Sequence, residues 1–243
     1  MKKKIIAAIF DLDGVLTRTA AQHAKAWKQL FDAYNERRKS EGEQPFEDFS
    51  IEQDYPKYID GIPRYDGIRN FLRSRNIELS EGNDSDKPSE LTISGLGNKK
   101  NEFFLKVIEE EGVEVFEKNI EQIKKWKSEG IKTAVISSSK NCKQILEVTG
   151  IEDLFEVRVD GVVSQERNIK GKPEPDIFLE AARELEVSPK DSMIVEDAIA
   201  GVQAGKVGGF GLVVGIVNGA SKIELLDNGA DVAVENLTQV KLK

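Results

Sequence analysis

Two carboxylates stand two positions apart where an apolar run near the N-terminus ends. Asp11 and Asp13 lie in the stretch IIAAIFDLDGVLT, residues 5–17, directly before a glycine. Side chains at positions i and i+2 of an extended segment point to the same side, so these carboxylates are expected to converge on one spot. Such a pair repels unless a cation offsets the repulsion. The pair alone fits a turn equally well, since Asp-Gly is common turn chemistry.

Acidic side chains also follow a second apolar run, in the stretch VEDAIAG. Glu196 and Asp197 stand at its end. Carboxylate oxygens are ligands that suit Mg²⁺, so two strand ends could together form a magnesium site. An acidic pair favoured by a helix dipole would give the same local pattern.

Two more polar stretches have residue types suited to binding phosphate. VISSSKN places Ser137 at the end of a third apolar run, where a hydroxyl and backbone N–H groups can hold phosphate oxygens. An ordinary serine N-cap is the alternative interpretation. GKPEPDIF carries Lys172 beside two prolines that stiffen the segment. Its ammonium is expected near the carboxylates, unless it is a solvated surface lysine.

The segments that would position these residues alternate between strand and helix patterns. Apolar, β-rich runs predict strands, and helical spacing with glycine stops predicts helices between them. The strands are expected at 4–10, 132–138, 192–197, 210–217 and 231–235, and the helices at 116–130, 140–150 and 198–208. This alternation is typical of an α/β fold with a Rossmann-like, doubly wound parallel sheet.

The pattern changes between residues 18 and 113, where strand signals disappear. Amphipathic helices are predicted at 20–39, 65–77 and 98–112, joined by polar stretches near 40–50 and 80–92. We therefore predict an α/β core of residues 1–17 and 114–243 and an inserted helical domain of residues 18–113. Ligands of open α/β sheets bind beyond the carboxyl ends of the strands, so the insert is expected over Asp11.

Composition excludes several functional classes. The 243 residues are 39% hydrophobic and 32% charged, with a formal net charge of −8, which argues against general binding of nucleic acid or membrane surfaces. No run is long enough to span a bilayer. Cys142 is the one cysteine, so a disulfide or a cysteine zinc site within the chain is excluded. We expect a cytoplasmic monomer.

The order of the four motifs resembles that of the haloacid-dehalogenase-like phosphotransferases. FDLDGVLT is similar to the first motif of that family, ISSS to the second, GKPEPDIF to the third and VED to the fourth. The resemblance implies that Asp11 is a nucleophile that forms an aspartyl-phosphate and that Asp13 is the general acid/base. It also implies that Ser137 and Lys172 hold the transferring phosphate. Mg²⁺ would be organised by Asp11, the Asp13 backbone, Glu196 and Asp197.

The insert resembles the cap of the β-phosphoglucomutase group of this family. IDGIPRYDG puts Arg64 in a glycine-flanked loop like the one that binds the phosphate not being transferred, and Lys100 stands where the group carries a cap lysine. The substrate-binding residues that the resemblance implies are Thr19, His23, Trp27, Gly61, Ile62, Arg64, Lys100, Ser138, Ser139, Lys140 and Asn141. Taken alone, His23 and Trp27 equally fit packing residues. The implied reaction interconverts β-D-glucose 1-phosphate and glucose 6-phosphate through glucose 1,6-bisphosphate.

Some positions depart from the pattern of the group and keep an alternative open. Arg18 stands where many relatives have an acidic residue, Ala198 where a serine is frequent, and the polar stretches lengthen the cap. A Mg²⁺-dependent sugar-phosphate phosphatase, of the trehalose-phosphate kind for example, is the alternative. A noncatalytic phosphosugar-binding module is disfavoured because Asp11, Asp13 and Lys172 are all present, and a receiver domain because of the large helical insert.

Overall fold

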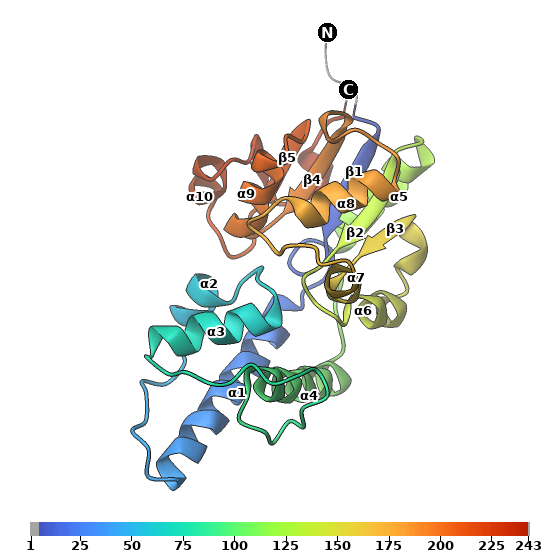
Figure 1. Cartoon of the computed structure of the whole chain (residues 1–243). Coiled ribbons are helices and arrows are strands. Elements are labelled where there is room, and N and C mark those ends of the chain that lie inside the picture. Colours follow the sequence, from blue (N-terminus) through green and yellow to red (C-terminus); the bar gives the residue numbers. More distant parts are fainter. Residues whose placement is uncertain (1–4, 243) are drawn as a thin grey trace. The chain divides into compact units, whose positions relative to one another are not determined.

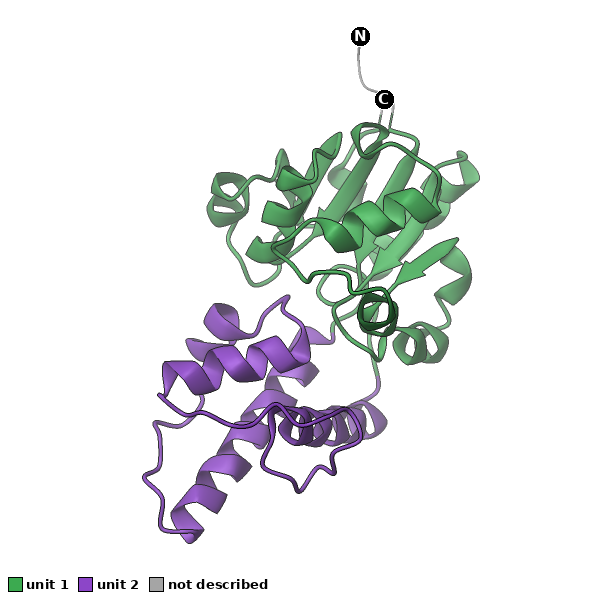
Figure 2. Ribbon diagram, in the orientation of Figure 1, with its two compact units in different colours: residues 1–18, 113–243 green, residues 19–112 purple. Residues whose placement is uncertain are grey.

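The computed structural model describes residues 5–242 and divides the chain into two compact units. Unit 1 comprises the described residues up to Arg18 together with those from Val113 onward, and unit 2 comprises Thr19–Gly112 (Figures 1 and 2). Each unit has its own apolar core, so each is described by itself.

Unit 1 contains a six-stranded sheet in the order β3-β2-β1-β4-β5-β6, and every neighbouring pair is parallel. The strands are β1 (Ala7–Asp11), β2 (Lys132–Ile136), β3 (Val157–Val159), β4 (Ser192–Glu196), β5 (Leu212–Ile216) and β6 (Val232–Val234). Phe10 of β1 aligns with Val135 on one side and Val195 on the other. The predicted α/β fold with a parallel sheet is confirmed, and β1 lies between β2 and β4.

The strands are shorter than the predicted ranges, and one was missed. The prediction began the first strand at residue 4, which lies outside the described residues, whereas β1 begins at Ala7 and includes Asp11. Ser137 and Asp197 lie one position beyond the last residues of β2 and β4. The missed strand, β3, has three residues with Arg158 in the middle, so neither its length nor its composition indicates a strand.

Helices pack on both faces of this sheet. They are α5 (Glu117–Ser128), α6 (Cys142–Thr149), α7 (Gly161–Glu166), α8 (Asp176–Glu184), α9 (Ile199–Val207) and α10 (Lys222–Asp227), with 3-10 turns η1 (Glu152–Leu154), η2 (Pro189–Asp191) and η3 (Leu237–Gln239). Figure 1 shows α8 beside β1 and β4. Ile9 lies in one core with Phe178 of α8. Its neighbour Phe10 stacks on Trp126 of α5 at 6.4 Å between ring centroids. Successive strand residues thus face opposite helical layers.

Unit 2 is helical and packs around aromatic rings. Its helices are α1 (Ala20–Ser40), α2 (Asp54–Tyr58), α3 (Arg64–Ser74) and α4 (Ile93–Glu111). Phe31 lies at the centre, with its ring 3.9 Å from that of Phe71 and 5.2 Å from that of Phe49. The prediction missed α2 and started α4 five residues late. Thr92 begins α4 as the N-cap residue, its hydroxyl accepting a hydrogen bond from the Gly95 N–H at 2.9 Å.

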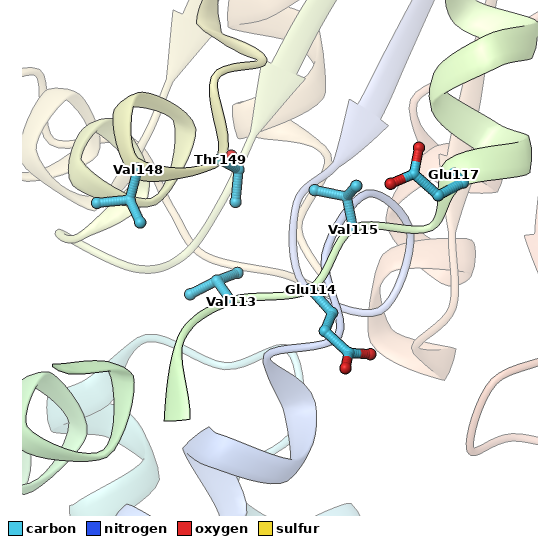
Figure 3. Close-up of a pocket in the computed structure, with 6 residues that line it drawn as sticks. All are labelled: Val113, Glu114, Val115, Glu117, Val148 and Thr149. Carbon is cyan, nitrogen blue, oxygen red and sulfur yellow. The ribbon is translucent and has the colours of Figure 1, made fainter. Parts of the chain in front are cut away.

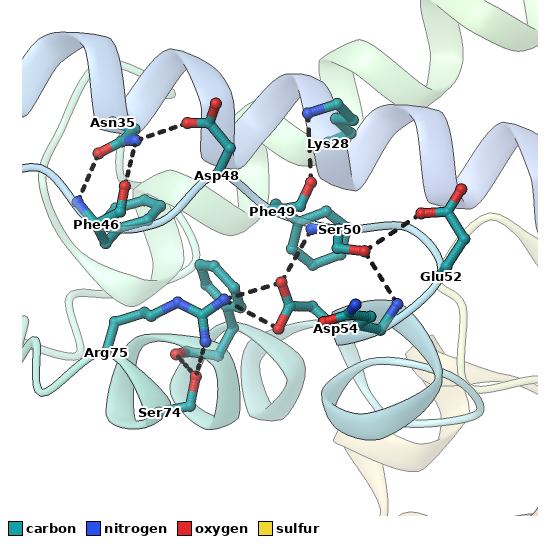
Figure 4. Close-up of polar contacts among 12 residues, drawn as sticks. Lys28, Asn35, Phe46, Asp48, Phe49, Ser50, Glu52, Asp54, Ser74 and Arg75 are labelled. Carbon is teal, nitrogen blue, oxygen red and sulfur yellow. Dashed lines mark hydrogen bonds and ion pairs between the residues drawn. The ribbon is translucent and has the colours of Figure 1, made fainter.

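The polar stretch after α1 is held in place by side chains rather than by helix (Figure 4). Asn35 of α1 donates to the Phe46 carbonyl at 2.8 Å and accepts from the Phe46 N–H at 3.0 Å. Asp54 accepts from the Ser50 N–H at 2.9 Å and pairs through both oxygens with Arg75, at 2.9 and 3.0 Å. This stretch is therefore an ordered part of unit 2. Across the described chain, no helix combines the length and the apolar character that a membrane span requires.

Candidate active site

The carboxyl ends of β2, β1 and β4 bring the predicted core residues together. Asp11 is the last residue of β1 and Glu196 the last residue of β4. Lys172 comes from the segment that precedes α8 and is 4% exposed. Because β1 pairs with both β2 and β4, residues at these three strand ends meet at one edge of the sheet.

Lys172 bridges two of these carboxylates. Its Nζ lies 2.8 Å from Asp11 Oδ1 and also forms an ion pair with Glu196 Oε1. Burial on its own would lower the pKa of Lys172, but Asp11 and Glu196 outweigh it and hold that pKa above its ordinary value. The lysine is therefore a fixed positive charge against Asp11.

The acidic residues form a cluster that fits a divalent cation. Asp11, Glu196 and Asp197 each offer a carboxylate oxygen, and these atoms lie within 4.8 Å of one another. Lys172 neutralises one of the three negative charges, so the cluster favours a cation with oxygen ligands such as Mg²⁺. Burial raises the pKa of Asp11, and Lys172 opposes that shift. A cation at the cluster would lower the pKa of Asp11 as well.

The second oxygen of Glu196 fixes the turn that follows β4. Glu196 Oε2 accepts the N–H of Asp197 at 3.0 Å and that of Ala198 at 2.9 Å. Gly201 of α9 passes so close that an added Cβ would lie 2.0 Å from the Glu196 Cδ. Glycine is therefore required at this position, and Glu196 has little freedom to move.

Asp13 and Ser137 face each other beside this cluster. The Ser137 hydroxyl donates to Asp13 Oδ2 at 3.4 Å and accepts the Ser139 N–H at 3.0 Å. The Ser139 hydroxyl in turn accepts the Asn141 N–H at 3.1 Å. Ser138, Ser139, Lys140 and Asn141 all lie in the short segment between β2 and α6.

Asn218, which the sequence analysis did not single out, also contacts the site. Its amide donates to the Gly14 carbonyl at 3.1 Å and to Asp197 Oδ2 at 3.3 Å. Gly14 has φ +86°, and an added Cβ would lie 1.8 Å from the same Asp197 oxygen. Asn218 and Gly14 therefore position Asp197. The Asn-Gly pair at 218–219 was an available signal, but it indicates only a turn.

Asn119 is a second residue that the sequence analysis missed. It is 1% exposed, and it donates to the Val15 carbonyl and accepts from the Leu237 N–H, each at 2.8 Å. Asn119 thus links the segment after Asp13 to the turn η3 through these two hydrogen bonds. A single asparagine inside an amphipathic helix pattern gives no signal of such a role.

In unit 2, two of the predicted residues lie against a third, Lys100. Lys100 of α4 is 3% exposed, and its Nζ lies 2.6 Å from His23 Nδ1. It also lies 5.3 Å from the ring centroid of Trp27. An ammonium group can only donate, so a charged Lys100 requires the His23 Nδ1 as the acceptor in this contact. Thr19 is buried just before α1, and its carbonyl accepts the His23 N–H at 2.8 Å.

Arg64 lies at the start of a helix, and the expectation of a loop was wrong. It is the first residue of α3, with Pro63 as the N-cap, because the fixed φ of proline suits a helix start. Gly61 and Ile62 lie in the turn before it. Arg64 donates to the Gly97 carbonyl at 3.3 Å and to Asn101 Oδ1 at 2.9 Å. Burial lowers the pKa of Arg64.

A separate hollow of about 430 Å³ lies in unit 1 beside the end of α6 (Figure 3). Its lining residues are Val113, Glu114, Val115, Glu117, Val148 and Thr149. None of the predicted site residues is among them, so this hollow is not the candidate active site.

A family model described as haloacid dehalogenase-like hydrolase matches residues 5–209. The chain belongs to this family. It is 42% identical over 243 residues to a beta-phosphoglucomutase from Mycobacterium bovis, covering 99% of this chain and 93% of the relative. It is 32% identical to a beta-phosphoglucomutase from Bacillus subtilis, over 98% of this chain and 92% of that protein.

A solved structure of the haloacid dehalogenase-like family also resembles this chain. The beta-phosphoglucomutase from Clostridium difficile superposes with a TM-score of 0.75 at 28% identity, covering 98% of this chain and 93% of that one. The resemblance to the β-phosphoglucomutase group is thereby confirmed, and the chain is an enzyme of this family.

Proposed function

We propose that the chain is a phosphosugar mutase that interconverts β-D-glucose 1-phosphate and glucose 6-phosphate. The observation that carries the proposal is the pair of buried contacts that Lys172 makes with Asp11 and Glu196 at the strand ends. It is supported by the end-to-end match, at 42% identity, to a beta-phosphoglucomutase.

In the first half-reaction, a phosphoryl group moves from Asp11 to the 6-hydroxyl of β-glucose 1-phosphate. The O6–P bond forms, the bond between phosphorus and the Asp11 oxygen breaks, and Asp13 takes the hydroxyl proton. The product is glucose 1,6-bisphosphate, which therefore also serves as the activator that supplies the phosphoryl group.

In the second half-reaction, the bisphosphate is used with its 1-phosphate at Asp11. An Asp11 oxygen attacks that phosphorus, the bond from phosphorus to O1 breaks, and Asp13 returns its proton to O1. Glucose 6-phosphate leaves, and the phosphorylated Asp11 is regenerated. Because Asp13 first accepts and then donates a proton, a second acidic residue beside the nucleophile is needed.

Lys172 and Ser137 hold the phosphoryl group while it transfers. The ammonium that contacts Asp11 is placed to balance the negative oxygens of the phosphoryl group, and the Ser137 hydroxyl can donate to one of them. Mg²⁺ would be held by Asp11, the Asp13 backbone, Glu196 and Asp197, and would supply charge neutralisation for the phosphoryl oxygens.

Arg64 of unit 2 binds the phosphate that is not being transferred. In unit 1, Ser139, Lys140 and Asn141 keep the phosphate-binding role that the family resemblance implies. The guanidinium of Arg64 is held by Gly97 and Asn101, so it loses little freedom when it binds an anion. His23 and Lys100 contact the substrate together with the remaining predicted residues of unit 2. The expected partner is a small phosphosugar, in a cytoplasmic setting and with no nucleic acid.

The test is an assay of β-glucose 1-phosphate with Mg²⁺, with and without a trace of glucose 1,6-bisphosphate. We expect glucose 6-phosphate to form at a rate that depends on the bisphosphate, and Asp11→Asn to abolish turnover. Release of inorganic phosphate in place of glucose 6-phosphate would overturn the proposal in favour of the phosphatase. Trehalose 6-phosphate and α-glucose 1-phosphate, run in parallel, test the sugar and the anomer.

A further inference from the structure

The polar stretch between α3 and α4 is fixed in place by hydrogen bonds. Asn98 of α4 donates to the Asp84 carbonyl at 3.1 Å and to the Asp86 carbonyl at 2.9 Å. Thr92 donates to Asp86 Oδ2 at 2.6 Å, and the Ser94 N–H donates to the Glu81 carbonyl at 3.0 Å. Asp84 itself is exposed, so this stretch presents its carboxylate to solvent at a defined position.

The Asp84 carboxylate contacts the phenol of Tyr65. The Tyr65 hydroxyl is hydrogen-bonded to Asp84, and burial together with the charge of Asp84 raises the pKa of Tyr65. The ring packs on the backbone of Gly97, where an added Cβ would lie 2.4 Å from the Tyr65 Cε1. Gly97 therefore allows Tyr65 to lie flat against α4.

Arg64 completes the cluster from the adjacent position of α3. The carbonyl of Gly97 accepts from its guanidinium, and the charges of Tyr65 and Asp84 act on it. Three polar groups thus lie together at the first turns of α4: the guanidinium of Arg64 and the phenol of Tyr65 from α3, and the carboxylate of Asp84 from the polar stretch.

We propose that Asp84 and Tyr65 are specificity-determining residues that bind a hydroxyl group of a phosphorylated sugar whose phosphate lies on Arg64. The inference rests on the proposed function of Arg64 in phosphate binding. A carboxylate offers about four acceptor positions, so Asp84 can accept a sugar hydroxyl while it holds Tyr65. Inorganic phosphate has a P–OH group but no sugar hydroxyl beyond the phosphate, and the charge of Asp84 repels it. The cluster therefore selects a phosphosugar over a bare phosphate ion.

The variant Asp84→Asn separates this role from a structural one, because it keeps the shape and removes the charge. We expect the dissociation constant of glucose 6-phosphate to rise about tenfold, since a hydrogen bond to a charged group is lost. The dissociation constant of inorganic phosphate should stay the same or fall. Tyr65→Phe should weaken glucose 6-phosphate binding in the same direction. Both ligands are measured by calorimetry on the full chain in an Asp11→Asn background, with Mg²⁺ present.

Glu81→Gln is the matched control, because Glu81 lies in the same stretch but pairs with Arg69. It should leave both dissociation constants unchanged. If Asp84→Asn weakens both ligands equally, or changes neither, the proposed role of Asp84 is overturned. If Arg64→Ala leaves the affinity for glucose 6-phosphate unchanged, the assignment of Arg64 fails and the inference fails with it. If Arg64→Ala weakens the binding of glucose 6-phosphate and Asp84→Asn does not, the inference about Asp84 is overturned and the assignment of Arg64 stands.

Discussion

Lys172 is the buried cation against Asp11, and the proposed function assigns it the transferring phosphoryl group. Lys172→Met keeps an unbranched side chain and removes the charged ammonium group. We expect turnover to fall by about a thousandfold, which is typical when a fixed electrostatic contact to the transition state is lost. Steady-state kinetics with β-glucose 1-phosphate measure the effect.

The matched control for this change is Lys170→Met, two residues away and exposed. It should leave turnover unchanged. Circular dichroism of both variants checks that the core is folded. Activity of a folded Lys172→Met variant within tenfold of the parent would contradict the role assigned to Lys172.

Asn218 offers a separate test of the acidic cluster. Asn218→Ala removes the amide that holds Asp197 Oδ2, so the affinity for Mg²⁺ should fall about tenfold, as for other residues that orient a metal ligand. Calorimetric titration of the substrate-free chain with Mg²⁺ measures this without reference to activity. Asn228→Ala, whose side chain contacts Gln203 and Glu224, is the control. An unchanged affinity in Asn218→Ala would show that Asp197 does not need this support.

The sequence indicated which core side chains lie together where residue type and strand end coincide. Asp11, Glu196 and Lys172 are chemically distinctive, and each follows or precedes a segment whose pattern is clear. Asn218 and Asn119 were missed because the sequence around an asparagine in a turn or a helix does not indicate which residues its side chain contacts. Arg64 was placed in a loop because the nearby glycines outweighed Pro63, which is in fact the N-cap residue of α3.

At the scale of elements, the contact of Asp54 with Arg75 joins α2 to the end of α3. Both side chains are largely buried, at 9% and 17% exposed. Asp54→Asn leaves Arg75 without its counter-charge and should lower the free energy of unfolding of unit 2 by about 3 kcal/mol, the lower end of the cost of breaking a buried ion pair. Urea unfolding followed by hydrogen exchange in α2 and α3 measures it.

A surface ion pair of the same unit provides the comparison. Arg69 pairs with Glu81 while both are more exposed, at 34% and 64%. Glu81→Gln should cost about 0.5 kcal/mol or less. Equal losses in the two variants would mean that burial does not distinguish these pairs, contrary to this account.

Two arginines beside Glu180 of α8 predict a pH dependence of stability. The hydrogen bond from Arg183, assisted by Arg167, lowers the pKa of Glu180 to about 2. A carboxyl with a depressed pKa stabilises the fold above its ordinary pKa, near 4.5, and the gain is lost as the pH falls toward 2. The partners are exposed, so the gain is about 1 kcal/mol at most.

The variant Glu180→Gln removes this titration. It should be less stable than the parent at pH 6, and the difference should shrink as the pH falls from 5 to 3. Thermal melts across this range measure it, with Glu174→Gln, an exposed position in the same unit, as the control. A stability difference that does not change with pH would contradict the assignment.

The elements differ in how well the sequence indicated them. Long periodic segments such as α1 were predicted to within a residue or two of their ends. The short elements β3 and α2 were missed because three to five residues cannot show a period. The start of α4 was placed late because glycines at 95 and 97 are poor helix formers, although close approach of Glu90 and Tyr65 to these glycines requires them.

At the scale of the whole molecule, the two segments that connect the units run side by side. The Arg18 N–H donates to the Glu114 carbonyl at 2.8 Å, and the Phe116 N–H donates to the Leu16 carbonyl at 2.9 Å. The Arg18 guanidinium lies 4.3 Å from the centroid of the Phe116 ring. Arg18 therefore packs on the segment that returns from unit 2.

One measurement tests the central claim that phosphate passes to a sugar rather than to water. A ³¹P NMR time course would follow the full chain with Mg²⁺, β-glucose 1-phosphate and a trace of glucose 1,6-bisphosphate. We predict a growing glucose 6-phosphate signal with little inorganic phosphate, absent in Asp11→Asn. Inorganic phosphate growing in step with substrate loss would contradict the mutase and identify a phosphatase.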